Sequence, residues 1–316
     1  MKKGIMDTMT PREDRILKCV EKDESGLNDF HRLPDLYGID IDKVGINRFR
    51  IPLQFKHKDG TVMNHDAETS MYIYFPKGKA GINMSRLYAI LGEEADDAIV
   101  DNTFFKTILH RYRADMRDST DEPLFDQSYL KIRFSYPIKQ KALKSDKYGW
   151  QYYRCVLEGR EDKNGDVGIF LSVHYEYSST CPCSLSMSKQ YEDEYKNNVT
   201  EEGSGMAVAH SQRSEAIVTV KLSADEEFFI EDLVDILRLA IPTETQSFVK
   251  RIDEQAFAVL NAENPMFVEH ATRRLSKALN DEPRFLDWVV SVEHLESLHS
   301  HNAVAVIRKG IEGGLK

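Results

Sequence analysis

Two reactive side chains lie at either end of a polar segment near the middle of the chain. Cys181 follows a strand-like run from 169 to 177, and His210 precedes a second such run from 215 to 222. If these two strands pair, the thiol and the imidazole come to facing strand ends. A polar insertion, Ser188 to Met206, separates them. A connection that is long and flanked by such groups is more often functional than idle.

Cys181, His210 and Glu254 together form a plausible set of metal ligands. A catalytic metal centre often has three protein ligands and an open position for water. Thiolate, imidazole and carboxylate all suit zinc or a similar divalent ion. The spacing is long, so another interpretation stays open. In it Cys181 and Cys183 are small buried residues, His210 is a surface histidine and Glu254 lies on a solvated helix face.

Glu269 interrupts an apolar run that follows Asn264 and Pro265. Its carboxylate is therefore expected to be partly buried, and a buried carboxylate needs a hydrogen-bond donor. The guanine edge, with a ring N–H and an exocyclic amine, is such a donor. The alternative is an ion pair with Arg273, four residues further along the same helix.

The segment from Glu296 to Asn302 carries alternating histidines. His299 and His301 share one face if this segment is extended. Glu296 could orient a histidine for proton transfer. The alternative is a polar hairpin loop.

Glycines and basic residues come before an expected helix in the segment 78–86, which includes Lys79 and Arg86. Such a segment could bind phosphate at the helix N-terminus. A flexible loop is the equally good alternative.

Length and composition limit the classes of protein to which this chain can belong. The chain has 316 residues and a net charge of −10, with mixed charges and ordinary apolar content. We expect a soluble globular protein that does not bind nucleic acid. No apolar run reaches the roughly 20 residues needed to span a bilayer, so no membrane association is expected. Four cysteines are too few for a disulfide scaffold, which favours a reduced, cytoplasmic setting.

Alternation and helical spacing predict an α+β fold with antiparallel sheets. Residues 1–43 are expected to form a loosely packed N-terminal arm. The rest reads as two units, 44–160 and 161–316, with element orders ββααββ and ββα(α)αββ. Ser223 and Glu226 fit a capping box that opens a helix ending before Pro242. The remaining helices are expected at 84–91, 102–116, 248–260 and 266–279, and the strands at 49–55, 69–75, 130–134, 150–157, 169–177, 214–222, 285–292 and 303–307.

Several segments occur in the order seen in one family. They are 179–184, 210–214, 253–255, 264–269 and 296–303. With them the chain resembles the type IB GTP cyclohydrolase I enzymes from about Gly45 to Ile307. The resemblance implies two tandem tunnelling-fold units, each ββααββ with helices on one face of an antiparallel sheet. It also implies a homotetramer with active sites at subunit interfaces.

The same resemblance implies roles for individual residues. Cys181, His210 and Glu254 match the metal ligands, and Glu269 matches the purine anchor. Cys181, Glu296 and His299 match catalytic positions. Gln212 and Arg213 are expected near the nucleotide. The sequence departs from the family pattern at three places. The interval from Cys181 to His210 is longer than in short members, although some bacterial members share it. The other two departures are local: His270 replaces a usual aspartate, and the glycine loop reads Lys79-Ala80-Gly81, shifted by one from the usual Lys-Gly pair.

The predicted activity is that of GTP cyclohydrolase I, with GTP as substrate. The enzyme hydrolyses GTP to formate and 7,8-dihydroneopterin triphosphate, the first step toward folate and other pterins. It is expected to use one divalent metal ion per site, namely zinc, manganese or iron(II). Two alternatives remain: a related cyclohydrolase that gives a cyclic-phosphate product, and a non-catalytic member in which Cys181 and His210 hold a structural metal.

Overall fold

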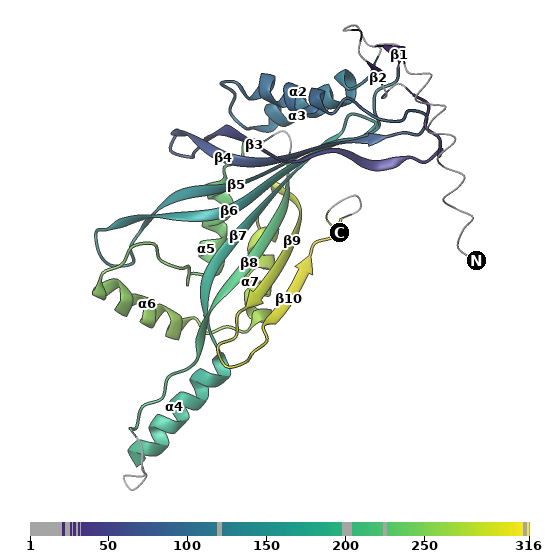
Figure 1. The fold of residues 1–316 in the computed structure, drawn as a ribbon. Helices are drawn as coiled ribbons and strands as arrows, with labels where there is room; N and C mark the ends of the chain where they lie inside the picture. Colours follow the sequence, from purple (N-terminus) through teal and green to yellow (C-terminus); the bar gives the residue numbers. More distant parts are fainter. Residues whose placement is uncertain are drawn as a thin grey trace, which may run out of the picture.

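A single antiparallel sheet of eight strands is the central feature of the computed structural model (Figure 1). The structure describes residues 21–22, 26, 28–29, 31, 33–118, 122–197, 204–223, 226–311 and 315. Residues 1–20 of the predicted arm lie outside this part. The strand order is β10-β9-β8-β7-β6-β5-β4-β3. The bounds are β3 Ile41–Lys56, β4 Val62–Phe75, β5 Ser128–Lys141, β6 Tyr148–Glu161, β7 Val167–Thr180, β8 Ser211–Leu222, β9 Phe285–His294 and β10 Ala303–Arg308.

The strands form where the sequence alternates between apolar and polar residues. In β5, Leu130, Ile132 and Phe134 are buried, whereas Lys131 and Arg133 are only half-buried. Successive side chains of a strand point to opposite faces, so this pattern buries one face of the sheet. All eight strands lie where they were predicted, although most are longer. β3 begins inside the segment predicted as an arm, and β1 (Glu21–Lys22) and β2 (Asn28–Asp29) form a separate small pair.

Helices from both halves of the chain cover the same face of the sheet. On β6, the hydroxyl of Tyr153 contacts Arg238 of α5, and a Cβ at Gly159 would collide with Phe105 of α3. Tyr153 and Gly159 are an even number of residues apart, so they point to the same side. The bounds are α2 Ser85–Ala95, α3 Asn102–Asp115, α5 Ile230–Ala240, α6 Arg251–Glu263 and α7 Val268–Asn280. The buried side chains of these layers belong to one continuous core.

Two local predictions were wrong. The insertion expected from Ser188 is in large part a helix, α4 (Pro182–Asn197), which extends beyond the end of β7 (Figure 1). The capping box at Ser223 does not form, because α5 begins only at Ile230, where the N–H of the N-cap residue Phe229 donates to Asp232 at 3.4 Å. The Ser223 N–H instead donates to the carbonyl of Arg284, 3.1 Å away, and so extends the sheet.

The order of elements repeats along the chain, as the sequence predicted. β3, β4, α2, α3, β5 and β6 come first, and β7, β8, α5, α6, α7, β9 and β10 follow, with α4 between β7 and β8. The α+β class with an antiparallel sheet is therefore confirmed. The expected boundary after residue 160 falls inside a continuous sheet, because β6 pairs with β7. In the described part of the chain, none of the helices is long and apolar enough to cross a membrane.

Candidate active site

The paired ends of β7 and β8 bring Cys181 and His210 together. Thr180 and Ser211 are the last residues in register, and the Cys181 N–H donates to the carbonyl of His210 at 3.2 Å. This confirms the prediction that the thiol and the imidazole lie at facing strand ends. Both side chains are partly exposed, whereas Cys183 is exposed on the first turn of α4. A ligand can therefore reach both groups from one side.

The imidazole of His210 has acceptors on one side. Its Nδ1 lies 3.0 Å from Oε1 of Gln212 and 3.8 Å from a carboxylate oxygen of Glu296. A carboxamide oxygen and a carboxylate only accept hydrogen bonds, so Nδ1 carries the proton. Nε2 then keeps its lone pair, which is the form that binds a metal. The sequence suggested that Glu296 orients a histidine, and the histidine beside it is His210.

Glu254 lies elsewhere on this chain. It is exposed on the first turn of α6, and its neighbour Asp253 is buried and accepts hydrogen bonds from the N–H groups of Lys144 and Ser145. Among the residues that the structure describes, no three His, Cys, Asp or Glu side chains are close enough together to hold a metal ion. Cys181 and His210 fit a metal by their chemistry and position, but the described part of this chain does not bring a third donor to them.

Glu269 lies near the same end of the sheet. The Met266 N–H donates to the carbonyl of Thr180 at 3.0 Å, which ties the start of α7 to the end of β7. Glu269 is exposed on the first turn of α7, so the expected partial burial was wrong. The alternative was also wrong, because no ion pair joins Glu269 and Arg273 in the described residues. The carboxylate is thus free for another partner.

Buried His294 lies close to Glu269. Its Nε2 is 2.9 Å from the hydroxyl of Tyr177, and only 2 % of the residue is exposed. Burial lowers the pKa of His294 to about 4, and the negative charge of Glu269 acts in the opposite direction. Sequence reasoning did not identify this pair, although Tyr177 and His294 both end apolar strand segments next to the predicted site.

Gln212 and Arg213 point to opposite faces of β8. Gln212 is buried and its amide donates to Oγ of Ser179 at 2.9 Å. Arg213 is exposed on the face of the sheet opposite Gln212, 3.7 Å from Glu176. Neighbouring residues of a strand alternate between faces, so these two side chains do not line one pocket of the same chain.

His299 and His301 lie in the exposed loop between β9 and β10. Their rings stack with centroids 4.8 Å apart, so they do share one side. The segment is a bent hairpin loop and not an extended strand. Within the described residues, no hydrogen bond, ion pair or ring contact joins His299 to Cys181 or His210.

Lys79, before α2, and Arg86, on its first turn, are already held by other groups of the same chain. Lys79 Nζ lies 2.7 Å from both Asp118 and Glu122, and Arg86 donates to the carbonyl of Arg117 at 2.8 Å. A phosphate that bound here would have to compete with these carboxylates for Lys79.

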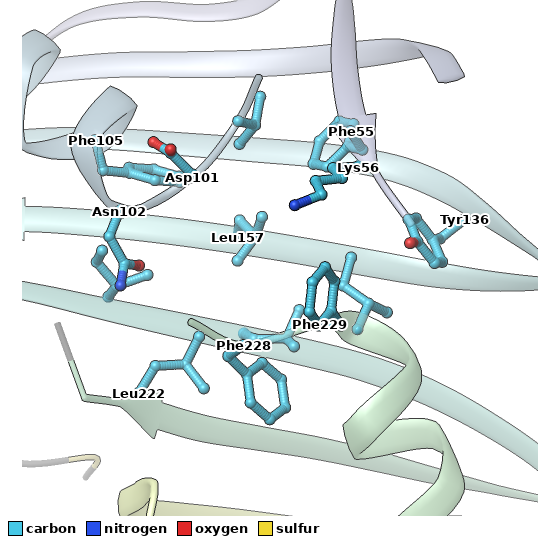
Figure 2. A pocket seen from close by; sticks show the side chains of 14 residues that line it. Phe55, Lys56, Asp101, Asn102, Phe105, Tyr136, Leu157, Leu222, Phe228 and Phe229 are labelled. Carbon is cyan, nitrogen blue, oxygen red and sulfur yellow. The ribbon is translucent and has the colours of Figure 1, made fainter. Parts of the chain in front are cut away.

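A cavity lies between the two halves, away from the groups described above (Figure 2). It has a volume of about 70 Å³, and its wall is mostly apolar, with the rings of Phe55, Tyr136 and Phe229 and the amine of Lys56 nearby. None of the predicted site residues lines it. The candidate site is instead the surface at the ends of β7 and β8.

Comparison with known proteins decides the family. A family model described as "Type I GTP cyclohydrolase folE2" matches residues 27–305. The chain belongs to this family. Curated relatives include "GTP cyclohydrolase FolE2" of Dinoroseobacter shibae, 41 % identical over 272 residues that make up 85 % of this chain and 70 % of the relative. The protein of the same name from Hydrogenovibrio crunogenus is 36 % identical over 289 residues, which cover 86 % of this chain and 90 % of the relative.

Membership in the FolE2 family confirms the prediction of a GTP cyclohydrolase made from the motifs. The family also indicates dependence on a metal, without identifying it. Among solved structures, a uricase from Arthrobacter globiformis aligns with a TM-score of 0.46 at 9 % identity, covering 87 % of this chain and 95 % of the uricase.

Proposed function

We propose that this FolE2 family member is a GTP cyclohydrolase I that converts GTP and water to formate and 7,8-dihydroneopterin triphosphate in folate biosynthesis. The observation that carries the proposal is the juxtaposition of Cys181 and His210 at the joined ends of β7 and β8. A thiol and an imidazole with a free Nε2 are suitable donors for zinc, manganese or iron(II). When bound, such an ion supplies Lewis-acid activation of water.

We propose that Glu254 of a neighbouring copy completes the set of ligands in a homotetramer. Glu254 is exposed, and the apolar residues Ile252 and Val259 on the same helix are also about half exposed. Near the Cys181 end, Met187 is 58 % exposed and Val208 is 92 % exposed. Exposed apolar residues around both halves of the ligand set favour burial against another subunit.

The other side chains then have separate tasks. Glu269 accepts hydrogen bonds from the guanine ring N–H and amine, and so holds the base with C8 toward the site of water attack. Glu296 supports His210, and His299 moves protons as the imidazole ring of guanine opens and formate leaves. Arg213, on the face of the sheet opposite Gln212, is placed to attract the nucleotide's negative charge. These roles follow the family motifs together with the positions described above.

Mixing of inactive variants tests the shared site. Cys181→Ala and Glu254→Ala should each lose metal and formate release from GTP, because a three-ligand site cannot spare a donor. If Glu254 comes from another copy, mixed tetramers of the two variants contain some intact sites and regain activity after co-refolding or co-expression. Cys183→Ala is the matched control and should keep metal and activity.

Each negative result of these experiments would contradict a different part of the proposal. Mixed tetramers without activity would place Glu254 in the same chain's site or outside any site. A wild-type protein that binds metal but releases no formate with Mn²⁺, Fe²⁺ or Zn²⁺ would favour the structural-metal alternative. A product lighter than the linear triphosphate would identify the cyclic-phosphate alternative by mass.

A further inference from the structure

A short chain of hydrogen bonds leads from His210 into the sheet. His210 Nδ1 is 3.0 Å from Gln212 Oε1, and Gln212 Nε2 donates to Ser179 Oγ at 2.9 Å. Ser179 Oγ is in turn 2.8 Å from Ser214 Oγ. Ser179 and Ser214 are fully buried, and Gln212 is 8 % exposed. Three buried polar groups at the ends of β7 and β8 therefore connect the partly exposed His210 to the interior of the sheet.

The direction of this chain is set at its His210 end, because the Ser179 and Ser214 hydroxyls can each donate or accept. Gln212 has one oxygen that accepts and one nitrogen that donates. In the structure its nitrogen donates to Ser179, and its oxygen faces His210 and accepts from a proton on Nδ1. The nearby carboxylate of Glu296 also favours a proton there. If the amide were turned round, its N–H would face Nδ1 and the proton would move to Nε2, which then could not bind a metal.

We propose that Gln212 is a positioning residue that holds His210 in the Nδ1–H form, with Nε2 free for the metal, and that Ser179 and Ser214 anchor the Gln212 side chain beside His210. This inference rests on the proposed metal site and assigns a role that differs from contact with the nucleotide. Both ends of the carboxamide are engaged within the sheet. Partners of this kind typically change metal affinity by about 10–100-fold when removed.

Comparing Gln212→Leu with Gln212→Glu separates the effect of the hydrogen bond to His210 from the effect of the size of the side chain. Leucine has a similar size but accepts no hydrogen bond, so zinc affinity measured by chelator competition should fall about 10–100-fold. Glutamate still accepts from Nδ1, and the Ser179 hydroxyl can donate to it. Gln212→Glu should therefore keep zinc affinity within about threefold of wild type, well short of the loss expected on removing such a partner. Nitrogen NMR of the metal-free protein should show the Nδ1–H form of His210 in wild type and a mixture in Gln212→Leu.

Ser179→Ala has a matched control on the same two strands. Ser172 and Thr219 also form a hydroxyl pair between β7 and β8, 2.7 Å apart and on the other face of the sheet. Ser179→Ala should weaken zinc binding, whereas Ser172→Ala should not, although each variant loses a hydroxyl pair between the strands. This comparison still tests the proposal if Gln212→Leu does not fold.

Unchanged zinc affinity in Gln212→Leu would overturn the inference. A raised KM for GTP with unchanged zinc affinity would also overturn it and assign Gln212 to the nucleotide. If Cys181→Ala also keeps its zinc, the proposed metal site itself is wrong. Loss of zinc in Cys181→Ala together with full binding in Gln212→Leu would refute only the role of Gln212.

Discussion

Glu269 lies on the first turn of α7 with no cation paired to it among the described residues. A carboxylate in this position is available to two donors of a guanine ring. Glu269→Gln keeps the size but loses the charge, and a hydrogen bond to a charged group is worth about 1.5–3 kcal/mol. We expect GTP affinity to fall by about 10–100-fold with metal content intact. Isothermal titration with a non-hydrolysable GTP analogue measures the change.

The matched control is Arg273→Ala. Because Arg273 forms no ion pair with Glu269, this variant should bind the analogue normally. Equal affinity losses in both variants would show that the two side chains act together, contrary to the role proposed for Glu269.

His294 should make stability depend on pH. Its pKa is lowered from 6.5 to about 4 by burial, so the unfolded chain binds a proton more readily than the folded one. The stabilisation is complete above about pH 6.5 and is lost as the pH falls toward 4. The loss is on the order of 3 kcal/mol, from about 1.36 kcal/mol per pKa unit. Urea unfolding at several pH values should show a smaller loss in His294→Gln than in wild type. His299→Gln, on the exposed loop, should retain the full loss.

Single residues show how far the sequence could predict the site. Cys181 and His210 were predicted to be neighbours because each adjoins the end of one of two strands that were expected to pair. The structure places them side by side. The partners of Gln212 could not be predicted, because they depend on which residue of β7 lies opposite it in the register. The surroundings of Glu254 could not be predicted either, since its exposure on α6 is not signalled by the periodicity of one chain.

α4 has little contact with the rest of the fold. Of the sixteen residues of this helix, all described, only Ser188 is buried. The Ser184 hydroxyl accepts from the His210 N–H at 3.1 Å, so the two ends of the insertion are already close. Replacing residues 186–207 by four glycines should leave the pairing of β7 and β8 intact. We expect the melting temperature to change by a few degrees at most and zinc affinity to remain, because little apolar area is removed.

Calorimetry and chelator competition measure both quantities in the shortened protein. Loss of zinc with an unchanged melting temperature would mean that α4 holds Cys181 in place. A smaller assembly than that of the full-length protein in size-exclusion chromatography would instead identify α4 as an assembly element.

Elements with a clear apolar stripe were predictable and the others were not. β5 and α7 bury alternate or helically spaced residues, and the sequence predicted both. α4 was missed because it has no apolar stripe, and a helix without one gives no periodic signal. The start of α5 was misplaced because Ser223 matches a capping box by type, yet its N–H extends the sheet. The hydrogen bond from Ser223 to Arg284 in the sheet forms in place of the local helix cap.

At the scale of the whole molecule, one buried carboxylate links the two halves. Glu244 accepts hydrogen bonds from Tyr153 of β6, from Gln140 of β5 at 2.8 Å and from Arg238 of α5 at 2.9 Å. Its side chain is 6 % exposed. Because strands of the first half and a helix of the second share this group, its loss should weaken both halves together. The continuous core and the pairing of β6 with β7 lead to the same expectation.

Glu244→Ala should therefore lower the free energy of unfolding by about 3–5 kcal/mol, because it removes the buried carboxylate that pairs with Arg238 and that also accepts from Tyr153 and Gln140. Asp235→Ala is the matched control: Asp235 also pairs with Arg238, at 3.3 Å, but it is half exposed and should contribute about 0–1 kcal/mol. The chain has two tryptophans, Trp150 on β6 and Trp288 on β9, so single-tryptophan variants report on each half separately. At fixed protein concentration, the two fluorescence transitions should coincide and shift by the same amount in Glu244→Ala. A shift seen by Trp288 alone would show that the two halves unfold independently and that Glu244 belongs energetically to the second.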